Sequence, residues 1–112
     1  MQMPHAKRAH VPEAKLQGYL LSESHPDGAS KARLLRRIGF DDSNADQLAE
    51  QLLSIAQTGP VDEIEPRTYG VMYVIHGTVV GPPGDSAILR TVWIIQAESD
   101  RPRLVTAYPA RR

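Results

Sequence analysis

The sequence contains no cysteine among its 112 residues. This absence excludes disulfide bonds and thiolate metal sites, and it fits a reducing cytosol. No apolar run approaches the roughly 18 residues that a membrane-spanning helix needs. Residues 1–10 also contain no apolar stretch of the kind found in secretory signals. We therefore expect a soluble, cytoplasmic protein that has no membrane partner.

The chain also lacks a net charge, because 13 basic and 13 acidic residues cancel. A neutral chain gains no long-range attraction to nucleic acid, which argues against a general DNA or RNA coat protein. The charges are nevertheless unevenly spread. Residues 31–37 carry four basic side chains and no acid, whereas residues 41–65 carry seven acids and no base. An enzyme with a small, local basic site remains compatible with this distribution.

Several sequence motifs of catalysis are missing as well. The chain has no glycine-rich phosphate loop, no HExxH zinc motif, no tight His/Asp cluster at metal-ligand spacing and no G-x-S-x-G nucleophile elbow. We therefore expect neither a cofactor nor a metal. Any chemistry would fall to histidine, lysine, arginine, threonine and tyrosine side chains.

The length and the hydrophobic content of 41% are typical of one globular domain over residues 1–112, with residues 1–11 loosely held. In the first half, apolar residues at helical spacing predict a helix over 12–22 and a second over 31–38. A third helix is expected to begin near residue 43 and to stop at Gly59-Pro60.

Three residues are expected to mark the ends of these helices. Ser30 can cap the start of the second helix, and Gly39 can end it in a left-handed conformation. Ser43 followed by Asp46 resembles a capping box for the third helix.

The second half of the chain is rich in β-branched and aromatic residues, which favour strands. The expected strands cover residues 61–65, 69–80, 87–96 and 103–108. Short Gly/Pro/Asp-containing turns between the later strands predict an antiparallel meander. Helices followed by strands give an α+β fold, with about three N-terminal helices packed on a four-stranded antiparallel sheet.

Alternation along a strand predicts which side chains share a face of this sheet. The expected sets are Leu89, Thr91, Trp93 and Ile95 in the third strand, and Leu104, Thr106 and Tyr108 in the last. Both faces of the sheet are fairly apolar. The pattern therefore leaves open which face meets the helices.

Two candidate site residues lie in the helical half. His25 lies in a Pro/Gly loop beside basic residues, where an exposed imidazole titrates near neutrality and suits proton transfer. The alternative is a surface histidine that supports the turn. Lys31 lies near the start of a helix, where the dipole disfavours a cation, so it could be aimed at an anion. The alternative is a solvated lysine on a basic helix face.

Four further polar residues lie in the strands. Arg90 interrupts an apolar strand, so it lies at an edge, pairs with an acid or lines a phosphate site. His76 is interpreted as a structural histidine. Thr106 and Tyr108 project on one side, and their hydroxyls could bind a phosphate or a 2′-hydroxyl, although both residues are ordinary β formers.

Three segments together resemble an uncharacterised family of bacterial domains. They are His25-Pro26-x-Gly28-x-x-Lys31-Ala32, Thr91-Val92-Trp93-Ile94-Ile95, and Pro102-Arg103-Leu104-Val105-Thr106-Ala107-Tyr108-Pro109. The resemblance extends over nearly the whole chain, from the Leu16-x-x-Tyr19-Leu20-Leu21 segment onward. Genes of this family often stand beside a small partner gene, as in toxin–antitoxin pairs.

That family is in turn similar to the barnase/EndoU/colicin/RelE-like ribonuclease toxins, which place N-terminal helices against a four-stranded antiparallel sheet. The resemblance implies catalytic roles for His25, Lys31, Thr106 and Tyr108, and it implies substrate binding by Arg90 and Arg103. This chain departs from many such toxins, which are clearly basic. The same fold also carries proteins that are not enzymes.

The sequence therefore predicts a metal-independent endoribonuclease toxin that cleaves RNA by attack of the 2′-hydroxyl on phosphate. Its partners would be the RNA substrate and a small cognate antitoxin or immunity protein. One alternative is a non-catalytic antitoxin or immunity protein whose acidic residues 41–65 mimic nucleic acid. Another is a binding module attached to phage or secretion machinery. Convergence of His25, Lys31, Thr106 and Tyr108 in one cleft would favour the enzyme.

Overall fold

The computed structural model describes residues 1–16 and 29–110, and for residues 29–32 it describes the backbone alone. The helices are α1 (Glu13–Lys15), α2 (Ala29–Arg37) and α3 (Ala45–Thr58), with short 3₁₀ helices at Ala6–Arg8 and Asp42–Asn44. The strands are β1 (Glu63–Arg67), β2 (Gly70–Val80), β3 (Ser86–Gln96) and β4 (Arg103–Pro109).

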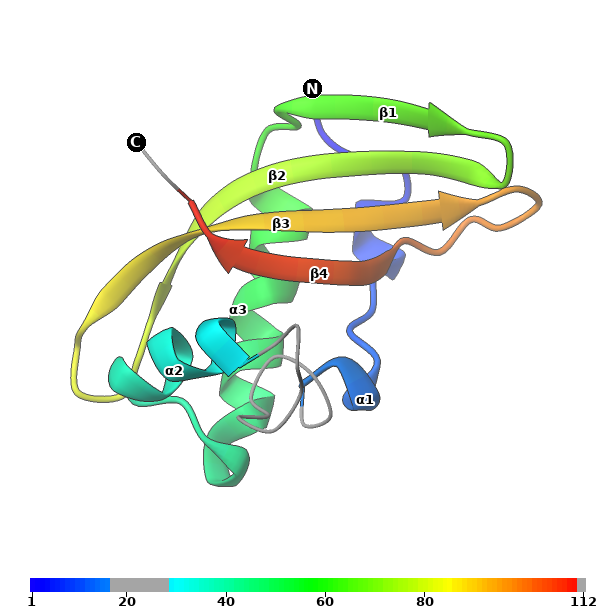
Figure 1. Cartoon of the computed structure of the whole chain (residues 1–112). Coiled ribbons are helices and arrows are strands. Elements are labelled where there is room, and N and C mark those ends of the chain that lie inside the picture. Colours follow the sequence, from blue (N-terminus) through cyan, green and yellow to red (C-terminus); the bar gives the residue numbers. More distant parts are fainter. Residues whose placement is uncertain (17–28, 111–112) are drawn as a thin grey trace.

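The strands form a sheet with the order β1-β2-β3-β4, in which each strand pairs antiparallel with its neighbour along the chain (Figure 1). The α+β class and the meander expected from the sequence are therefore confirmed. The three later strands lie within one residue of their predicted bounds, whereas β1 begins two residues later than expected.

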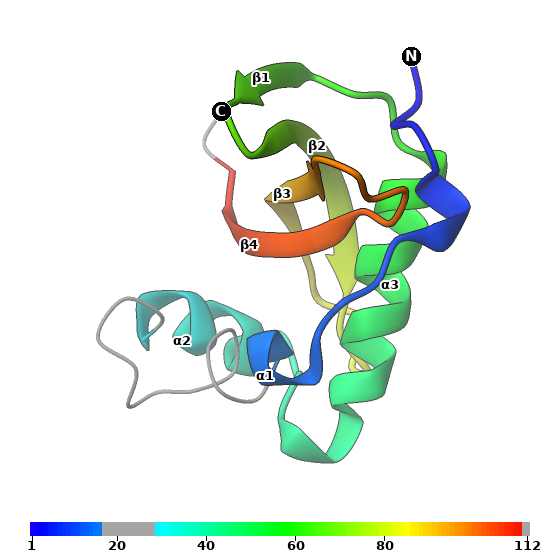
Figure 2. The ribbon, with the colours of Figure 1, turned by 90° about the vertical axis from the view of Figure 1, so that its right-hand side faces the viewer.

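One face of the sheet, called here the inner face, carries the main hydrophobic core. The helix α3 runs along β2 on this face, and α1 and α2 lie beside β4 (Figure 2). The largest fully buried side chains of this core are Trp93, Phe40, Leu35, Leu48, Leu52, Ile75, Leu89 and Leu104. The open question of which β3 face meets the helices is thereby answered, since Leu89 and Trp93 belong to this core and the partly buried Ile95 packs against it.

A threonine within the core supports the largest core side chain. Thr91 is fully buried, and its hydroxyl donates to the carbonyl of Ile75 at 2.5 Å. The same oxygen accepts the indole N–H of Trp93 at 2.9 Å. Each polar group therefore has a partner, which removes the penalty of burying them.

Close packing of α3 on β2 depends on a glycine. A Cβ atom at Gly77 would lie 2.4 Å from Cγ1 of Ile55, which is far inside van der Waals contact. The missing side chain lets the helix approach the strand, and Ile55 fills the space above Gly77. This approach shapes the groove described below.

Gly39 ends α2 in the way that the sequence predicts. Its φ of 108° is left-handed, and the Phe40 N–H donates to the carbonyl of Leu35 at 2.9 Å while the Gly39 N–H donates to that of Arg36 at 3.1 Å. These two bonds form a Schellman motif. At its other end, α2 begins at Ala29, so Ser30 lies inside the helix and not at its cap.

The capping box predicted for the third helix needs correction, and the helix predicted over 12–22 lies partly outside the described residues. The capping box is formed by Asp41 and Asn44, not by Ser43 and Asp46. A 3₁₀ turn precedes α3, and the Ser43 N–H and hydroxyl both donate to Asp41 Oδ1. The helix expected over 12–22 is observed as α1, and residues 17–22 lie outside the described part.

The predicted facing of the β4 side chains was wrong for Leu104, which was expected to share a face with Thr106 and Tyr108. A bulge opposite Val92 and Trp93 shifts the register, so Leu104 pairs with Trp93 and Thr106 pairs with Val92. Leu104 therefore points into the core, while Thr106 and Tyr108 share the opposite face. The extra residue of a bulge reverses the alternation on one side of it, and simple period-two counting does not anticipate this.

Candidate functional site

The face of the sheet that is turned away from α3, called here the outer face, carries a line of polar side chains. His76 of β2 is directly opposite Arg90 of β3, and Arg90 is directly opposite Tyr108 of β4. Neighbouring strands lie about 4.8 Å apart, so these three side chains follow one another across the sheet. We call His76, Arg90 and Tyr108 the polar row.

Asp62, just before β1, fixes the first member of the row. Its Oδ2 accepts from the backbone N–H of His76 at 2.9 Å and lies 2.8 Å from Nδ1 of the same residue. Both hydrogen bonds lower the pKa of Asp62, the side-chain bond more than the backbone bond. An ionised carboxylate only accepts hydrogen bonds, so Nδ1 must carry a proton. In the neutral ring, Nε2 is then the free acceptor.

Arg90 is the fixed positive charge of the row. Its Nη1 lies 2.5 Å from Oε2 of Glu63 in β1, and its side chain is 25% exposed. The hydrogen bond that Arg90 donates to Glu63 raises the pKa of Arg90 most, and a hydrogen bond to Tyr108 raises it further. Arg90 in turn lowers the pKa of Glu63. The ion pair engages one nitrogen of the guanidinium, whose planar fork of donors matches phosphate oxygens.

Apolar residues surround the row on the outer face. Val74, Val92 and Ile94 are buried there although they do not belong to the main core. They provide an apolar surface next to the partly exposed His76 and Arg90. Charged groups interact more strongly in such surroundings than in open water.

The sequence-predicted site residues are only partly placed. Thr106 and Tyr108 lie on the outer face, opposite Val92 and Arg90. Arg103 lies on the same face but opposite Ile94, at the far end of β3 from Arg90. Lys31 lies in the first turn of α2, where the backbone alone is described, and His25 lies outside the described residues. Their expected convergence with Thr106 and Tyr108 stays a prediction.

His76 was interpreted from the sequence as a structural histidine, and it does bind Asp62. The sequence nevertheless contained a signal for its neighbourhood. A hairpin centred on Pro83, within the expected turn 81–85, places residue 76 opposite residue 90, as observed. This pairing brings an imidazole beside a guanidinium. The hydrogen bonds between Asp62 and His76 could not be predicted in the same way, because they depend on the path of the chain after α3.

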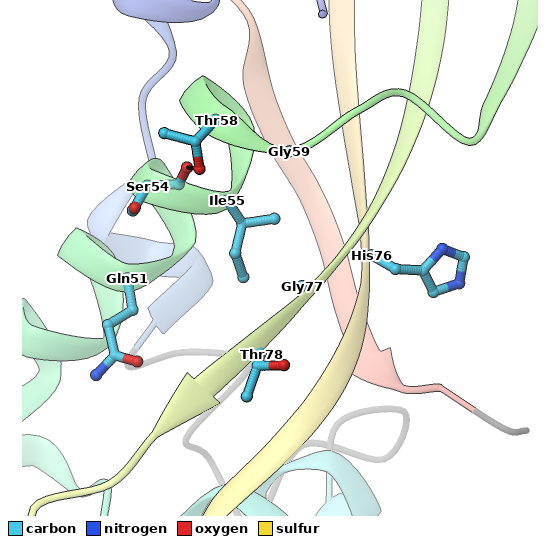
Figure 3. A pocket seen from close by; sticks show the side chains of 8 residues that line it. All are labelled: Gln51, Ser54, Ile55, Thr58, Gly59, His76, Gly77 and Thr78. Carbon is cyan, nitrogen blue, oxygen red and sulfur yellow. Dashed lines mark hydrogen bonds between the residues drawn. The ribbon is translucent and has the colours of Figure 1, made fainter. Parts of the chain in front are cut away.

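A groove adjoins the row at the edge of β2, between this strand and α3 (Figure 3). Its volume is about 280 Å³, and its lining residues are Gln51, Ser54, Ile55, Thr58, Gly59, His76, Gly77 and Thr78. Figure 3 shows the side chains of Gln51 and Ile55 on the helix side of β2, whereas the His76 ring points to the other side. His76 therefore takes part in both features.

Within the described residues, no three His, Cys, Asp or Glu side chains are grouped so that they could hold a metal ion. The described part also contains no helix that is long and apolar enough to cross a membrane. The imidazole, guanidinium and phenol of the polar row make it a candidate site for acid–base and electrostatic chemistry.

The sequence places this chain in a known family of domains. Residues 2–111 match the family described as "Domain of unknown function (DUF6883)", and the chain belongs to this family. Among curated proteins, none matches the chain.

A similar fold occurs in a solved structure from Klebsiella pneumoniae 342, which is described as a contact-dependent growth inhibition toxin–immunity protein complex. One chain of that complex matches with a TM-score of 0.72 and 14% sequence identity, over 96% of this chain and 98% of that chain. At this identity the likeness establishes a shared fold.

Proposed function

We propose that this protein is a metal-independent endoribonuclease of the bacterial toxin type, and that the polar row is its active site. One observation carries the proposal: an imidazole held by a carboxylate, a guanidinium and a phenol lie directly opposite one another on three adjacent strands. These are a base, a fixed cation and a hydroxyl that follow one another across one face of the sheet. The outer face of β1–β4 would receive the RNA.

In the proposed reaction, Nε2 of His76 accepts the proton of the ribose 2′-hydroxyl. The 2′-oxygen then forms a bond to the adjacent phosphorus, and the bond from phosphorus to the 5′-oxygen breaks. Tyr108, at the other end of the row from His76, donates a proton to that oxygen. The products are a 5′-hydroxyl and a 2′,3′-cyclic phosphate. The nucleophile comes from the substrate, so DNA is not cleaved.

Arg90 stabilises the charge that develops on the phosphate oxygens. Its ion pair with Glu63 orients the guanidinium before substrate arrives, so little reorganisation is needed during the reaction. Thr106, beside Tyr108 on the same face, contributes a hydroxyl to the phosphate site. Arg103 lies farther along β3 and would contact the RNA backbone beyond the cleaved bond.

His25 and Lys31 remain part of the proposal as a second set of groups. The resemblance assigns them catalytic roles, and His25 is a second candidate, beside Tyr108, for the group that protonates the leaving oxygen. The pH–rate profiles of His76→Ala and His25→Ala decide between the roles, because loss of the base removes the acid limb of the profile and loss of the acid removes its alkaline limb.

The toxin assignment draws support from the solved structure of similar fold, whose description names a toxin and an immunity protein. We propose that this chain likewise has a small cognate partner that covers the outer face. Such a pair would act in the cytosol, where the RNA substrate is found. The partner should present acidic groups to Arg90 and Arg103.

The decisive experiment is incubation of the purified protein with RNA in EDTA. We expect cleavage that leaves 2′,3′-cyclic phosphate ends, and we expect His76→Ala to lower its rate by about 10²–10⁴-fold. His5→Ala is the matched control, because His5 is exposed near the N-terminus and away from the row. Equal cleavage by the wild type and His76→Ala would refute the role of the row, and no cleavage by any form would refute the enzyme.

A second candidate is a non-catalytic antitoxin or immunity protein. Asp42, Asp46 and Glu50 are all exposed at the start of α3, and no basic residue interrupts the sequence around them. This acidic surface could bind a basic toxin. Strong induction in a bacterial host separates the candidates: a ribonuclease should arrest growth, and His76→Ala should restore it, whereas an immunity protein should leave growth unchanged.

A further inference from the structure

We propose that the groove between α3 and the edge of β2 binds a nucleobase next to the cleaved phosphodiester. This inference rests on the proposed function, and it adds that the enzyme recognises a base as well as the RNA backbone. It is argued from the free edge of β2, from the side chains that close this edge at both ends, and from the position of His76.

The edge of β2 is only partly paired. β1 pairs with Gly70–Val74 of β2, and β2 continues to Val80 without a neighbouring strand on that side. The N–H and C=O groups of alternate residues point to this edge, as the contacts of His76 and Val80 show. Thr78 lies midway between these two residues, so its N–H and C=O point the same way. Among the described residues, neither group has a hydrogen-bond partner on this side.

Side chains close the edge on both sides of Thr78. The Gln51 carboxamide donates to the Val80 carbonyl and accepts from the Val80 N–H, each at 2.7 Å. At the other end, the carboxylate of Asp62 accepts a hydrogen bond from the N–H of His76. An added strand from another protein would have to displace both side chains, because strand addition needs a continuous edge. Among the described residues, the groups left open between these two closures are the His76 carbonyl and the N–H and C=O of Thr78, a short stretch that suits a compact ligand.

That ligand needs a hydrogen-bond acceptor next to a donor, because Thr78 offers one N–H and one C=O. The Watson–Crick edge of a nucleobase presents neighbouring groups of this kind. The groove also offers apolar surface from Ile55, Gly59 and Gly77 to the face of a ring. Its volume of about 280 Å³ lies near the lower end of ligand pockets, which start at about 300 Å³, so it suits a single base.

The hydroxyls of Ser54 and Thr58 line the helix side of the groove. Thr58 donates its proton to the Ser54 carbonyl at 2.7 Å, so its oxygen is left as an acceptor for a ring amino group. Ser54 is exposed and can act as donor or acceptor. These hydroxyls would distinguish one base from another.

The groove and the polar row meet at His76. Its backbone lines the groove while its ring lies on the outer side of β2, and Asp62 contacts both its N–H and its ring (Figure 3). A nucleotide whose base fills the groove would pass its ribose over this edge toward Nε2 of His76. The groove would thus select the nucleotide whose 2′-hydroxyl attacks.

The test is an equilibrium titration of the ¹⁵N-labelled protein with the four 3′-nucleoside monophosphates, followed by amide chemical shifts. We expect one or two bases to shift the amides of Thr78 and Gly59, and the others to shift mainly the region of Arg90. Ser54→Leu fills the groove from an exposed position and should weaken the preferred nucleotide at least tenfold. Gln57→Leu is the matched control, because Gln57 is exposed on the same helix but does not line the groove.

Binding of all four nucleotides without shifts at Thr78 would overturn the inference, as would unchanged affinity in Ser54→Leu. Shifts at Thr78 that arise only with a cognate partner protein would also overturn it and would assign the edge to that partner. Cleavage is measured separately, so base binding without cleavage would end the ribonuclease proposal while leaving the base site. Cleavage without base binding would do the reverse.

Discussion

The two faces of the sheet are built from alternating residues of the same strands, and their chemistry differs. On the inner face, Leu89, Thr91 and Trp93 are essentially fully buried, and every polar group named there has an internal partner. On the outer face, His76 and Arg90 remain partly exposed and bind acids at the surface. The comparison teaches that the main core lies on the inner face, whereas the outer face combines the buried Val74, Val92 and Ile94 with partly exposed charged side chains that can form a site.

Truncation of the largest inner-face side chain should have the greatest effect on stability. Trp93→Ala removes a fully buried indole and leaves a cavity against Leu104 and Thr91, so we expect the free energy of unfolding to fall by about 3–5 kcal/mol. Urea denaturation measures this change. Tyr108→Phe on the outer face is the control, and a comparable loss there would contradict the division between the faces.

The close contact between α3 and β2 leaves no room for a side-chain atom at Gly77, so adding one should lower stability. Gly77→Ala places a methyl group 2.4 Å from Ile55 Cγ1, and we expect overpacking to cost about 1–3 kcal/mol. Ile55→Ala in the same chain removes the clash, so the double variant should be less unstable than the sum of the two single variants. If the losses in the free energy of unfolding, measured by urea denaturation, are strictly additive, then α3 does not pack directly on Gly77.

Protonation of His10 should lower stability in mildly acid solution. Burial first, and then the nearby Arg101, lowers the pKa of His10, whose buried Nδ1 has no hydrogen-bond partner among the described residues. The folded state therefore favours the neutral ring. Its contribution is complete above the unfolded pKa of about 6.5 and is lost as the pH falls below that value.

Denaturation midpoints at pH 7.5 and pH 5.5 test this expectation. The wild type should lose more stability between these values than His10→Gln, which has no titrating ring. An equal loss in both proteins would assign the pH dependence to other groups.

The smallest effect on stability is expected for the ion pair of the outer face. Glu63→Gln removes an exposed partner of Arg90, and such pairs contribute little to folding, so the urea midpoint should hardly move. RNA should bind a few-fold more tightly, because a negative charge beside the phosphate site is lost. Filter binding in the His76→Ala background measures this without cleavage. Weaker binding would mean that Glu63 orients Arg90 more than it competes with phosphate.

The parts of the fold with a strong local pattern were predictable. The content of β-branched and aromatic residues and the turn residues between the strands located β2 and β3 within one residue. Gly39 marked the end of α2, because only a left-handed conformation closes the Schellman motif there. The β4 bulge was not predictable, because nothing local in Arg103–Pro109 announces an extra residue. The start of α3 was misassigned because Ser43 and Asp46 fit the capping pattern as well as Asp41 and Asn44 do.

Only part of the candidate site could be predicted from the sequence. Arg90 was identified by its position in an apolar strand, whereas the roles of Thr106 and Tyr108 were implied by the family resemblance. The register of the sheet brings Arg90 opposite Tyr108. His76 was underestimated, because its importance comes from neighbours on other strands. The groove at Thr78 had no sequence signal at all, since it depends on where β1 stops and on how closely α3 approaches Gly77.

The sequence by itself determined the α+β class, the meander and the residue types available for chemistry, because periodicity and turn residues act over a few neighbouring positions. The tertiary structure decided which face meets the helices, which imidazole lies beside Arg90, and where a strand edge stays open. Those outcomes depend on contacts between residues far apart in the chain, such as Asp62 with His76 and Gln51 with Val80. No local pattern encodes them, because each requires two separate elements to arrive at the same place.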